Sequence, residues 1–293
     1  MQNTSSSETI TIQEETSAPD ILVVSRTFFP KEGGIEEYVY NRCLQNLQKT
    51  ILLTATFEGY QDFDKYQEFR VHRWYLPKIP RLFGLGAIIK QVLNMFWTFV
   101  FAIKLYFRYR YRYIEWGHGY DFPAILLLSY LLPVKFFIYL HGNDILCPLR
   151  NPILKKLFEL TLHRSSGLVC NSSFTRDFIK LKFNFNTPTY IINPIVRAEK
   201  FSDDAKNQQY LENSRLNIRK KYNISENAIV ILSVGRLVKR KGFGTVIDNL
   251  NQLLNQGLDV HYIICGRGKM QSKLEQKAAQ LQLTQRVHFA GFV

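Results

Sequence analysis

Short apolar runs alternate with longer segments of helical periodicity along most of this chain. The apolar runs have the length of buried strands, and they span residues 21–25, 50–54, 69–74, 113–116, 134–140, 167–170 and 189–192. The helical segments between them span residues 35–47, 82–107, 123–131, 151–162 and 173–182, the last capped by Ser172 or Ser173. Strands that alternate with helices predict a parallel sheet with helices on both faces.

The same alternation starts again after a polar stretch. Residues 197–227 are polar and are expected to hold a helix near 211–222. Beyond them the pattern predicts two helices, at 243–255 and 270–281, and three strands, at 229–234, 259–265 and 286–289. A doubly wound domain usually has five or six strands, so this second α/β domain is expected to be incomplete.

The pattern divides the chain into four parts: a tail at 1–19, a domain at 20–194, a connector at 195–227 and a partial domain at 228–293. The tail is rich in Ser, Thr and Glu and lacks an apolar core. We therefore expect it to be disordered and not to be a signal peptide.

Composition narrows the choice of partners. The chain has 293 residues, of which 46% are hydrophobic, which is enough to fill two cores. A formal net charge of +14 predicts an anionic partner, either a nucleic acid, an anionic lipid or a phosphorylated small molecule. The four cysteines are far apart and form no CxxC pair, so we expect buried thiols in the reducing cytoplasm and neither disulfides nor a zinc site.

The strongest candidate for chemistry lies at the start of the second domain. The strand at 229–234 ends at Gly235, and four cations follow it closely: Arg236, Lys239, Arg240 and Lys241. Backbone N–H groups at the start of the next helix and these cations attract the same anion, so the segment predicts a phosphate site. It matches neither the phosphate-loop pattern nor the Rossmann glycine fingerprint. Gly266 and Gly268 follow the neighbouring strand, so this second loop is expected to face the same crevice.

Polar and glycine-rich loops also follow strands of the first domain, where ligands of open α/β sheets bind. Gly33 and Gly34 follow the first strand, where they allow close backbone approach or form an ordinary tight turn. His118 ends the strand at 113–116, and the strand at 134–140 is followed by His141, Asn143 and Asp144. These groups suit a polar site, and the alternative is a network that only closes the loops.

The segment 82–113 has the composition of a membrane-surface element. Its apolar run is interrupted by polar residues that fall within one arc of roughly 140°, namely Lys90, Gln91, Asn94, Thr98, Lys104 and Arg108. This pattern predicts an amphipathic helix and not a transmembrane span. Arg then alternates with Tyr through 108–113, which suits a lipid headgroup region. The alternative is a core helix followed by a solvated basic strand edge.

Together these motifs resemble glycosyltransferase family 4, the retaining nucleotide-sugar glycosyltransferases of GT-B fold. The resemblance covers residues 21–293 and is strongest in ILSVGRLVKRKGF and in YIICGRGKMQSKLEQKAAQLQLTQRVHFAGFV. Pro30 to Gly34 looks like the Pro-x-x-Gly-Gly loop of the family, and His141 to Asp144 looks like its His-Gly-x-Asp segment. Asn171 to Thr175 resembles the Ser-containing segment after the next strand.

The resemblance implies two Rossmann-like domains that face a cleft, the first for the acceptor and the second for a nucleoside-diphosphate sugar. Arg236 and Lys241 would hold the donor pyrophosphate and neutralise the leaving diphosphate without a metal. His141 would contact the transferred sugar, and Gly33 and Gly34 would approach the donor phosphates and the acceptor.

By the same resemblance, Gly266 and Gly268 would line the nucleotide site, and His118, Asn143 and Asp144 would lie on the acceptor side. The acceptor would be a lipid-linked glycan or a polysaccharide. The expected location is the cytoplasm, at the inner face of an anionic membrane, and no cofactor is expected.

Two departures from the family pattern qualify this expectation. Asn193-Pro194 stands where the family usually has Asn-Gly at the domain junction. The family's Glu-x7-Glu element, which holds ribose and sugar, lies downstream of the segment that matches Gly291 to Val293. The chain is therefore expected to transfer sugar poorly or not at all, and the alternative is a fragment that binds nucleotide or a partner without turnover. Nucleic-acid binding is suggested by the net charge alone, and the sequence contains no recognised nucleic-acid-binding module.

Overall fold

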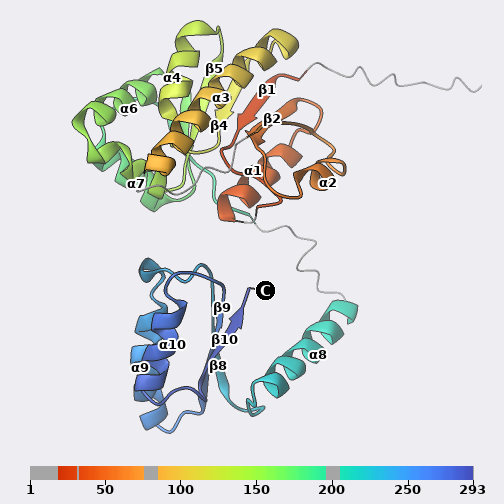
Figure 1. The fold of residues 1–293 in the computed structure, drawn as a ribbon, viewed down its shortest axis with the longest axis vertical. Coiled ribbons are helices and arrows are strands. Elements are labelled where there is room, and N and C mark those ends of the chain that lie inside the picture. The colour runs from red at the N-terminus through yellow and green to blue at the C-terminus, as the bar shows by residue number, and fades with distance from the viewer. Residues whose placement is uncertain (1–18, 32, 76–84, 196–204, 293) are drawn as a thin grey trace, which may run out of the picture. The chain divides into compact units, whose positions relative to one another are not determined.

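In the computed structural model, the described residues are 19–31, 33–75, 85–195 and 205–292 (Figure 1). The chain divides into two compact units, Met1–Val196 and Arg197–Val293. This boundary lies two residues beyond the predicted end of the first domain, and it assigns the predicted connector almost entirely to the second unit. The predicted tail lies outside the described residues except for its last residue, Pro19.

The first unit is built on a seven-stranded sheet. Its strands are β1 (Ile21–Val24), β2 (Thr50–Ala55), β3 (Arg70–Trp74), β4 (Tyr113–Trp116), β5 (Lys135–Leu140), β6 (Gly167–Cys170) and β7 (Thr189–Ile191). They lie in the order β3-β2-β1-β4-β5-β6-β7, and every pairing is parallel. The parallel sheet predicted from the alternation is therefore confirmed.

Helices cover both faces of this sheet. They are α1 (Gly34–Leu44), α2 (Tyr60–Asp64), α3 (Leu85–Tyr109), α4 (Phe122–Leu131), α5 (Asn143–Leu146), the 3-10 helix η1 (Pro148–Arg150), α6 (Pro152–Arg164) and α7 (Ser173–Lys182). Side chains from α3, α4, α6 and α7 share one large core with the sheet, whereas Val39 and Cys43 of α1 belong to a smaller core on the other face. In β1, Leu22 and Val24 enter the large core and Val23 the smaller one, which explains why this strand is apolar throughout.

The second unit contains a three-stranded parallel sheet. Its strands are β8 (Ile229–Val234), β9 (Val260–Cys265) and β10 (Val287–Gly291), in the order β10-β9-β8. Its helices are α8 (Ala205–Lys221), the 3-10 helix η3 (Lys239–Lys241), α9 (Phe243–Asn255) and α10 (Gln271–Gln280). Residues of α9 and α10 form one core with β9, in which Ile247, Leu250 and Ile264 are fully buried.

The element boundaries agree closely with the sequence pattern. The strands at 113–116, 167–170 and 229–234 and the helices at 173–182 and 243–255 are found as predicted. Ser172 caps α7, because its hydroxyl oxygen accepts the N–H of Thr175 at 3.2 Å. The predicted buried thiols are confirmed for three of the four free cysteines, and Cys147 is half-buried. The short helices α2, α5, η1 and η3 lack a full period of the hydrophobic pattern, and the sequence did not reveal them.

The orientation of α3 corrects the sequence prediction. The predicted polar arc is split, because Asn94 and Thr98 are buried while Lys90, Gln91 and Lys104 are exposed. The reason is a hydrogen bond: the buried indole Nε1–H of Trp74 on β3 donates to Asn94 Oδ1 at 3.0 Å. Thr98 donates its hydroxyl to the Asn94 carbonyl one turn earlier. Inward polar groups leave apolar side chains on the outward face of this helix.

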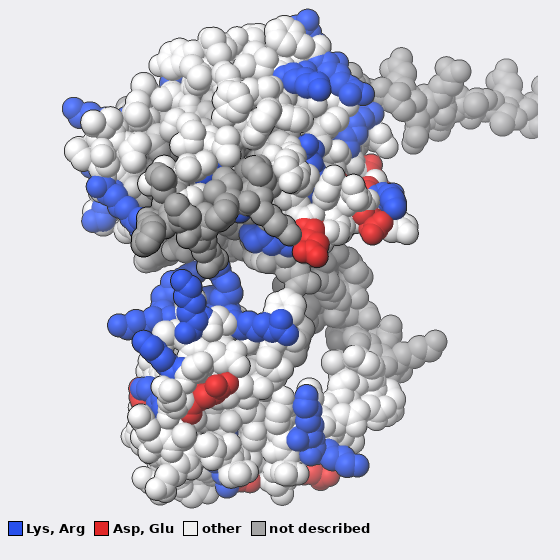
Figure 2. Space-filling view, viewed as in Figure 1, with Lys and Arg blue, Asp and Glu red and all other residues white. Residues whose placement is uncertain are grey.

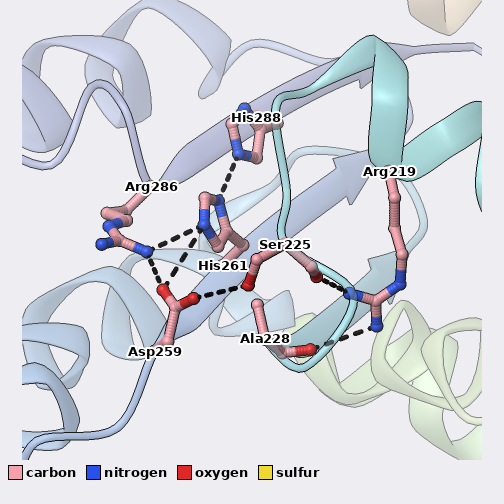
Figure 3. Close-up of polar contacts among 7 residues, drawn as sticks. All are labelled: Arg219, Ser225, Ala228, Asp259, His261, Arg286 and His288. Carbon is pink, nitrogen blue, oxygen red and sulfur yellow. Dashed lines mark hydrogen bonds and ion pairs between the residues drawn. The ribbon is translucent and has the colours of Figure 1, made fainter.

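A polar cluster joins β9 and β10 to the end of α8 (Figure 3). The Arg286 guanidinium donates to His261 Nε2 at 2.8 Å, so the Nδ1–H of His261 donates to His288 Nε2 at 2.9 Å. Asp259 pairs with Arg286 and accepts the Ser225 hydroxyl at 2.8 Å. The network therefore holds both imidazoles neutral.

The helix end is fixed to the same place. Arg219 of α8 donates to the carbonyl oxygens of Ser225 and Ala228, and the Tyr222 ring lies 4.8 Å from the His288 ring. Burial, reinforced by neighbouring positive charge, lowers the pKa of both His261 and His288. The folded second unit thus binds fewer protons at these rings than the unfolded chain does.

We expect Asn94→Ala to lower the unfolding free energy of the first unit by about 1–3 kcal/mol, because the buried Trp74 N–H then has no acceptor. Tryptophan fluorescence during urea unfolding measures this, since Trp74, Trp97 and Trp116 all belong to the first unit. Gln91→Ala, at an exposed position of the same helix, is the control and should change the free energy by less than about 0.5 kcal/mol. Equal effects of the two changes would contradict the inward orientation of Asn94.

The second unit should lose stability in acid. Its histidine pKa values are lowered on folding, so its unfolding free energy should fall as the pH drops through the ordinary histidine range near about 6.5. Urea unfolding followed by the methyl NMR signals of buried Ile247 and Ile264 measures this. His288→Gln keeps an acceptor for His261 but removes one titrating ring, so the loss should shrink. An unchanged pH dependence in this variant would refute the assignment.

Candidate functional site

Two loops at the carboxyl ends of β8 and β9 are bonded to each other through their backbones. The N–H of Gly235 donates to the Cys265 carbonyl at 2.9 Å, and the N–H of Leu237 donates to the Arg267 carbonyl at 3.1 Å. In return, the Leu237 carbonyl accepts the N–H of Met270 at 3.1 Å. Residues 235–242 and 266–270 therefore form one surface, which we call the basic loop pair. The two loops thus lie side by side, and the crevice that they were expected to face remains a prediction.

Gly266 and Gly268 are glycines because of this close contact. A Cβ on Gly266 would lie 2.0 Å from the Gly235 carbonyl oxygen, and one on Gly268 would lie 2.5 Å from the Leu237 carbonyl oxygen. Gly266 also has φ +139°, which L side chains rarely adopt. Both glycines therefore shape the basic loop pair from within, and contact with a nucleotide remains a prediction for them.

The basic loop pair has six cations and no carboxylate: Arg236, Lys239, Arg240, Lys241, Arg267 and Lys269. Arg236, Lys239, Arg240 and Lys241 are exposed, and none of the four forms a hydrogen bond or ion pair through its side chain with a described residue. Lys239–Lys241 forms the single turn η3, whose last N–H donates to the Val238 carbonyl. In Figure 2, Lys and Arg atoms gather at this end of the second unit.

A helix begins beside these cations. Gly242, with φ 74°, precedes α9, and no side chain caps the first turn. The first N–H groups of a helix have no partner within it and carry the positive end of its dipole. Phe243 anchors this start in the core at 4% exposure. The N–H of Thr245 donates to the Gly242 carbonyl at 2.9 Å, which leaves the first N–H groups of the helix beside cations that have no partner among the described side chains. This arrangement suits an anion such as a pyrophosphate, whose binding remains a prediction.

The carboxyl ends of the first sheet bring together the predicted histidine and glycine loops. The neighbours β1 and β4 form the switch point of the strand order, where ligands bind in open α/β sheets. The N–H of Gly117, after β4, donates to the Val24 carbonyl at 2.7 Å. His141, after β5, lies next to this loop, because its Nε2 bonds the Gly117 carbonyl oxygen at 3.0 Å.

His118 belongs to the scaffold and not to the acceptor surface. It is 2% exposed, its Nε2 accepts the backbone N–H of Arg26 at 2.8 Å, and its Nδ1 bonds the Tyr120 carbonyl oxygen at 3.2 Å. Burial, with the positive charge of Arg26, lowers its pKa to about 3. A neutral ring with both nitrogens occupied fixes the loop after β1 against the loop after β4, which corrects the predicted acceptor contact.

Asp144 is likewise structural. It is 1% exposed and accepts the N–H of Gly119 at 2.7 Å and that of His141 at 3.1 Å. This carboxylate therefore belongs to a network that closes the loops, which was the alternative to a polar ligand site. Its predicted place on the acceptor side was wrong. Asn143 is exposed and remains a candidate.

His141 is the histidine that stays available at this edge. The Gly117 carbonyl can only accept, so Nε2 of His141 carries the proton and Nδ1 is left as an acceptor. The Tyr38 ring packs edge-on against the imidazole at 5.2 Å, and the side chain is half-buried. Its orientation is thus fixed by a backbone carbonyl and an aromatic ring, as a substrate-positioning group requires.

The Gly33-Gly34 loop packs against a buried carboxylate. A Cβ on Gly33 would lie 2.3 Å from Glu36 Oε2, whereas one on Gly34 would meet nothing within 4 Å. Burial alone would raise the pKa of Glu36, but hydrogen bonds from Lys31 and Thr27 outweigh it and hold the pKa below its ordinary value. Gly33 therefore allows the approach of Glu36, and the space beside Gly34 is open to a ligand.

The sequence did not reveal a half-buried ionic network in the first unit. Arg42 of α1 donates twice to Glu115 of β4, at 2.6 and 2.5 Å, and the Tyr139 hydroxyl of β5 donates to the same carboxylate at 2.9 Å. Glu115 and Tyr139 line an open cavity of about 630 Å³ with Arg176 and Tyr190. These residues are far apart in the sequence, so only the strand register brings them together. Among the described residues, no three His, Cys, Asp or Glu side chains are grouped as metal ligands would be.

Comparisons with known proteins agree with this geometry. Residues 214–293, which include the basic loop pair, match the family model "Glycosyl transferases group 1". The chain is 22% identical over 284 residues to one polypeptide of the human phosphatidylinositol N-acetylglucosaminyltransferase, covering 94% of this chain and 54% of that protein. It is 23% identical to the alpha-monoglucosyldiacylglycerol synthase of Streptococcus pneumoniae, covering 91% of this chain and 60% of the synthase. The chain thus spans little more than half the length of these relatives.

Among solved structures, the Anabaena protein HepE in complex with UDP-glucose matches with a TM-score of 0.67 at 18% identity. The match covers 94% of this chain and 69% of HepE. A sucrose-phosphate synthase from Thermosynechococcus elongatus matches with a TM-score of 0.65. At this level of identity the similarity shows the fold, and it confirms the predicted GT-B type of α/β fold.

The contact at Gly268 makes a test of the basic loop pair. We expect Gly268→Ala to lower the unfolding free energy of the second unit by at least about 2 kcal/mol, because a methyl group cannot fit against the Leu237 backbone. The methyl NMR signals of Ile247 and Ile264 during urea unfolding measure it. Gly244→Ala is the matched control, since a Cβ there meets Leu274 at an ordinary 3.6 Å within α9, where Ala is favoured over Gly. A tolerated Gly268→Ala would show that the loops separate freely.

Proposed function

We propose that this protein is a glycosyltransferase whose basic loop pair binds the pyrophosphate of a nucleoside-diphosphate sugar. The observation that carries the proposal is the set of unpaired cations at the start of α9, within the region that matches the group 1 glycosyl transferases. The known complex of HepE with UDP-glucose supports a uridine nucleotide as the first donor to test. Family 4 is the assignment that best fits the order of the motifs.

The cations have a direct role in the proposed reaction. When the sugar leaves, negative charge develops on the nucleoside diphosphate, and Arg236 and Lys241 would stabilise it. Preorganised cations at a helix start need little reorganisation as that charge develops. We propose on this basis that transfer needs no metal ion and retains the configuration of the sugar, without a covalent protein intermediate.

The first unit supplies the positioning groups in this proposal. His141, held by the Gly117 carbonyl, offers its Nδ1 to a sugar hydroxyl. The open space beside Gly34 lets the backbone approach the donor phosphates or the acceptor. Asn143, exposed at the start of α5, lies in the same loop as His141 and suits an acceptor hydroxyl.

We propose a lipid-linked glycan or a polysaccharide as the acceptor. The name of the human relative includes phosphatidylinositol, and the streptococcal relative is named as a synthase of monoglucosyldiacylglycerol, which supports a lipid acceptor. A lipid acceptor implies work in the cytoplasm at the inner face of a membrane, as a peripheral protein. Product analysis with radiolabelled UDP-glucose and diacylglycerol or polysaccharide acceptors would choose between the two classes.

Charge removal in the basic loop pair is the sharpest test of donor binding. We expect Arg236→Gln and Lys241→Gln each to weaken UDP binding by about tenfold to a hundredfold, since each removes a charge-assisted hydrogen bond to phosphate. Isothermal titration calorimetry in the presence of EDTA measures the affinity and shows in the same experiment whether donor binding needs a metal ion.

Lys273→Gln on α10 is the matched control, because it removes one charge at an exposed position outside the basic loop pair. Its UDP affinity should stay at the wild-type value. If Lys273→Gln weakens binding as much as Lys241→Gln does, the effect is one of net charge and the pyrophosphate site is wrong. If EDTA abolishes wild-type binding, the metal-independent part of the proposal fails.

A further inference from the structure

The outward face of α3 is apolar although its inward face contains polar groups. Five of its exposed side chains are apolar, with exposed fractions of 42–63%: Ile88, Ile89, Val92, Phe96 and Phe107. Ile88, Val92 and Phe96 follow one another at intervals of four residues, so they form a continuous stripe on the helix. A soluble monomer rarely exposes an extended apolar patch of this kind, which points to a binding partner.

The neighbouring helix extends this apolar surface. α4 packs beside α3 and contains no charged residue. It exposes Leu127, Tyr130 and Leu131 by 49–57%. In Figure 1, α3 crosses the near side of the first unit, and Figure 2 shows this side as largely free of charged atoms over the middle of the helix. Two adjacent helices thus present one apolar surface.

The charges carried by these two helices have one sign. Neither α3 nor α4 contains an Asp or Glu, whereas α3 exposes Lys90, Lys104 and Arg108. Arg110 follows the helix, and its guanidinium lies over the rings of Tyr106 and Phe107 at 5.5 and 5.4 Å. Cations stacked on aromatic rings at the edge of an apolar surface match the headgroup region of an anionic bilayer.

We propose that α3 and α4 dock on an anionic lipid bilayer, with α3 lying in the plane of the headgroups. A bilayer fits better than a protein partner because the exposed apolar side chains, from Ile88 to Phe96 and at Phe107, lie on a single helix about 37 Å long whose exposed charges are all positive. The proposal goes beyond the transfer reaction and does not depend on it.

The packing of α3 favours surface contact over crossing of the bilayer. Ile88–Tyr109 has the length and mean hydropathy, 1.4, of a membrane-spanning helix. However, Ala102 and Leu105 are buried in the large core, and Asn94 is bonded to Trp74 of the sheet. Insertion of α3 across a bilayer would uncover the sheet and place this polar pair in lipid, where unsatisfied groups are costly.

Vesicle co-sedimentation at low ionic strength tests the docking surface with the whole chain. The probes are vesicles of phosphatidylcholine alone and vesicles in which a third of the lipid is phosphatidylserine. We expect binding to the anionic vesicles to exceed binding to the neutral ones by about tenfold or more, because several cations border the surface. No binding of the wild-type chain to the anionic vesicles would overturn the proposal.

Variants on two helices locate the surface. Val92→Ser combined with Phe96→Ser should weaken binding to anionic vesicles by about tenfold, because two exposed apolar side chains no longer enter the bilayer. Phe174→Ser combined with Leu181→Ser, at exposed apolar positions of α7, is the matched control and should bind as the wild type does. Lys104→Gln combined with Arg108→Gln should lose most of the preference for anionic vesicles.

Two further measurements make the outcome decisive. Tryptophan fluorescence in urea should show the same unfolding midpoint for both serine variants, so that lost binding is not lost folding. UDP affinity should be unchanged in them, which separates this proposal from the proposed function. Equal vesicle binding by the Val92/Phe96 and Phe174/Leu181 variants would overturn the assignment to α3. So would a dimer of the chain that the Val92/Phe96 variant abolishes, because the occupant would then be a second copy.

Discussion

Parallel pairing is the constraint on which the rest of this structure depends. All strands of each sheet run in the same direction, so every strand delivers its carboxyl end to the same edge. In the first unit this brings the loops after β1, β4 and β5 into mutual hydrogen bonding through His118, Asp144 and His141. In the second it brings two glycine loops so close that their backbones touch. The two sites follow from strand direction before any side chain contributes chemistry.

Cations of the first unit and cations of the basic loop pair differ in burial and in pairing, and this difference supports the proposed anion site. Inside the first unit, the half-buried Arg42 pairs with Glu115, and Arg73, whose side chain is 3% exposed, pairs with Asp64, because an unpaired charge away from water is costly. Around the basic loop pair, the cations are exposed and have no carboxylate partner among the described side chains. Water solvates these exposed cations, so they need no carboxylate partner. Their positive charge is therefore available to the diphosphate that we propose as the ligand. The degree of burial thus distinguishes the paired cations of the first unit from the exposed cations of the basic loop pair.

A single buried hydrogen bond determines what α3 presents to solvent. The Trp74 indole N–H lies inside the large core and needs an acceptor, which Asn94 supplies. With Asn94 and Thr98 turned inward, the rotation of the helix is fixed, and Val92 and Phe96 are left outside. An interior polar contact therefore creates an exterior apolar surface about half a turn away.

The sequence by itself determined the alternation of strands and helices, the glycine loops and the cluster of cations after β8. These features depend on local periodicity, turn chemistry and composition, which neighbouring residues encode. Only the tertiary structure decided that His118 and Asp144 are scaffold groups, that Arg42 meets Glu115 and Tyr139, and that Asn94 faces inward. Each of these outcomes depends on the register between strands, or between a strand and a helix, that are distant in the chain. The hydrophobic pattern shows which residues prefer burial, but it does not show which polar groups they contact once they are buried.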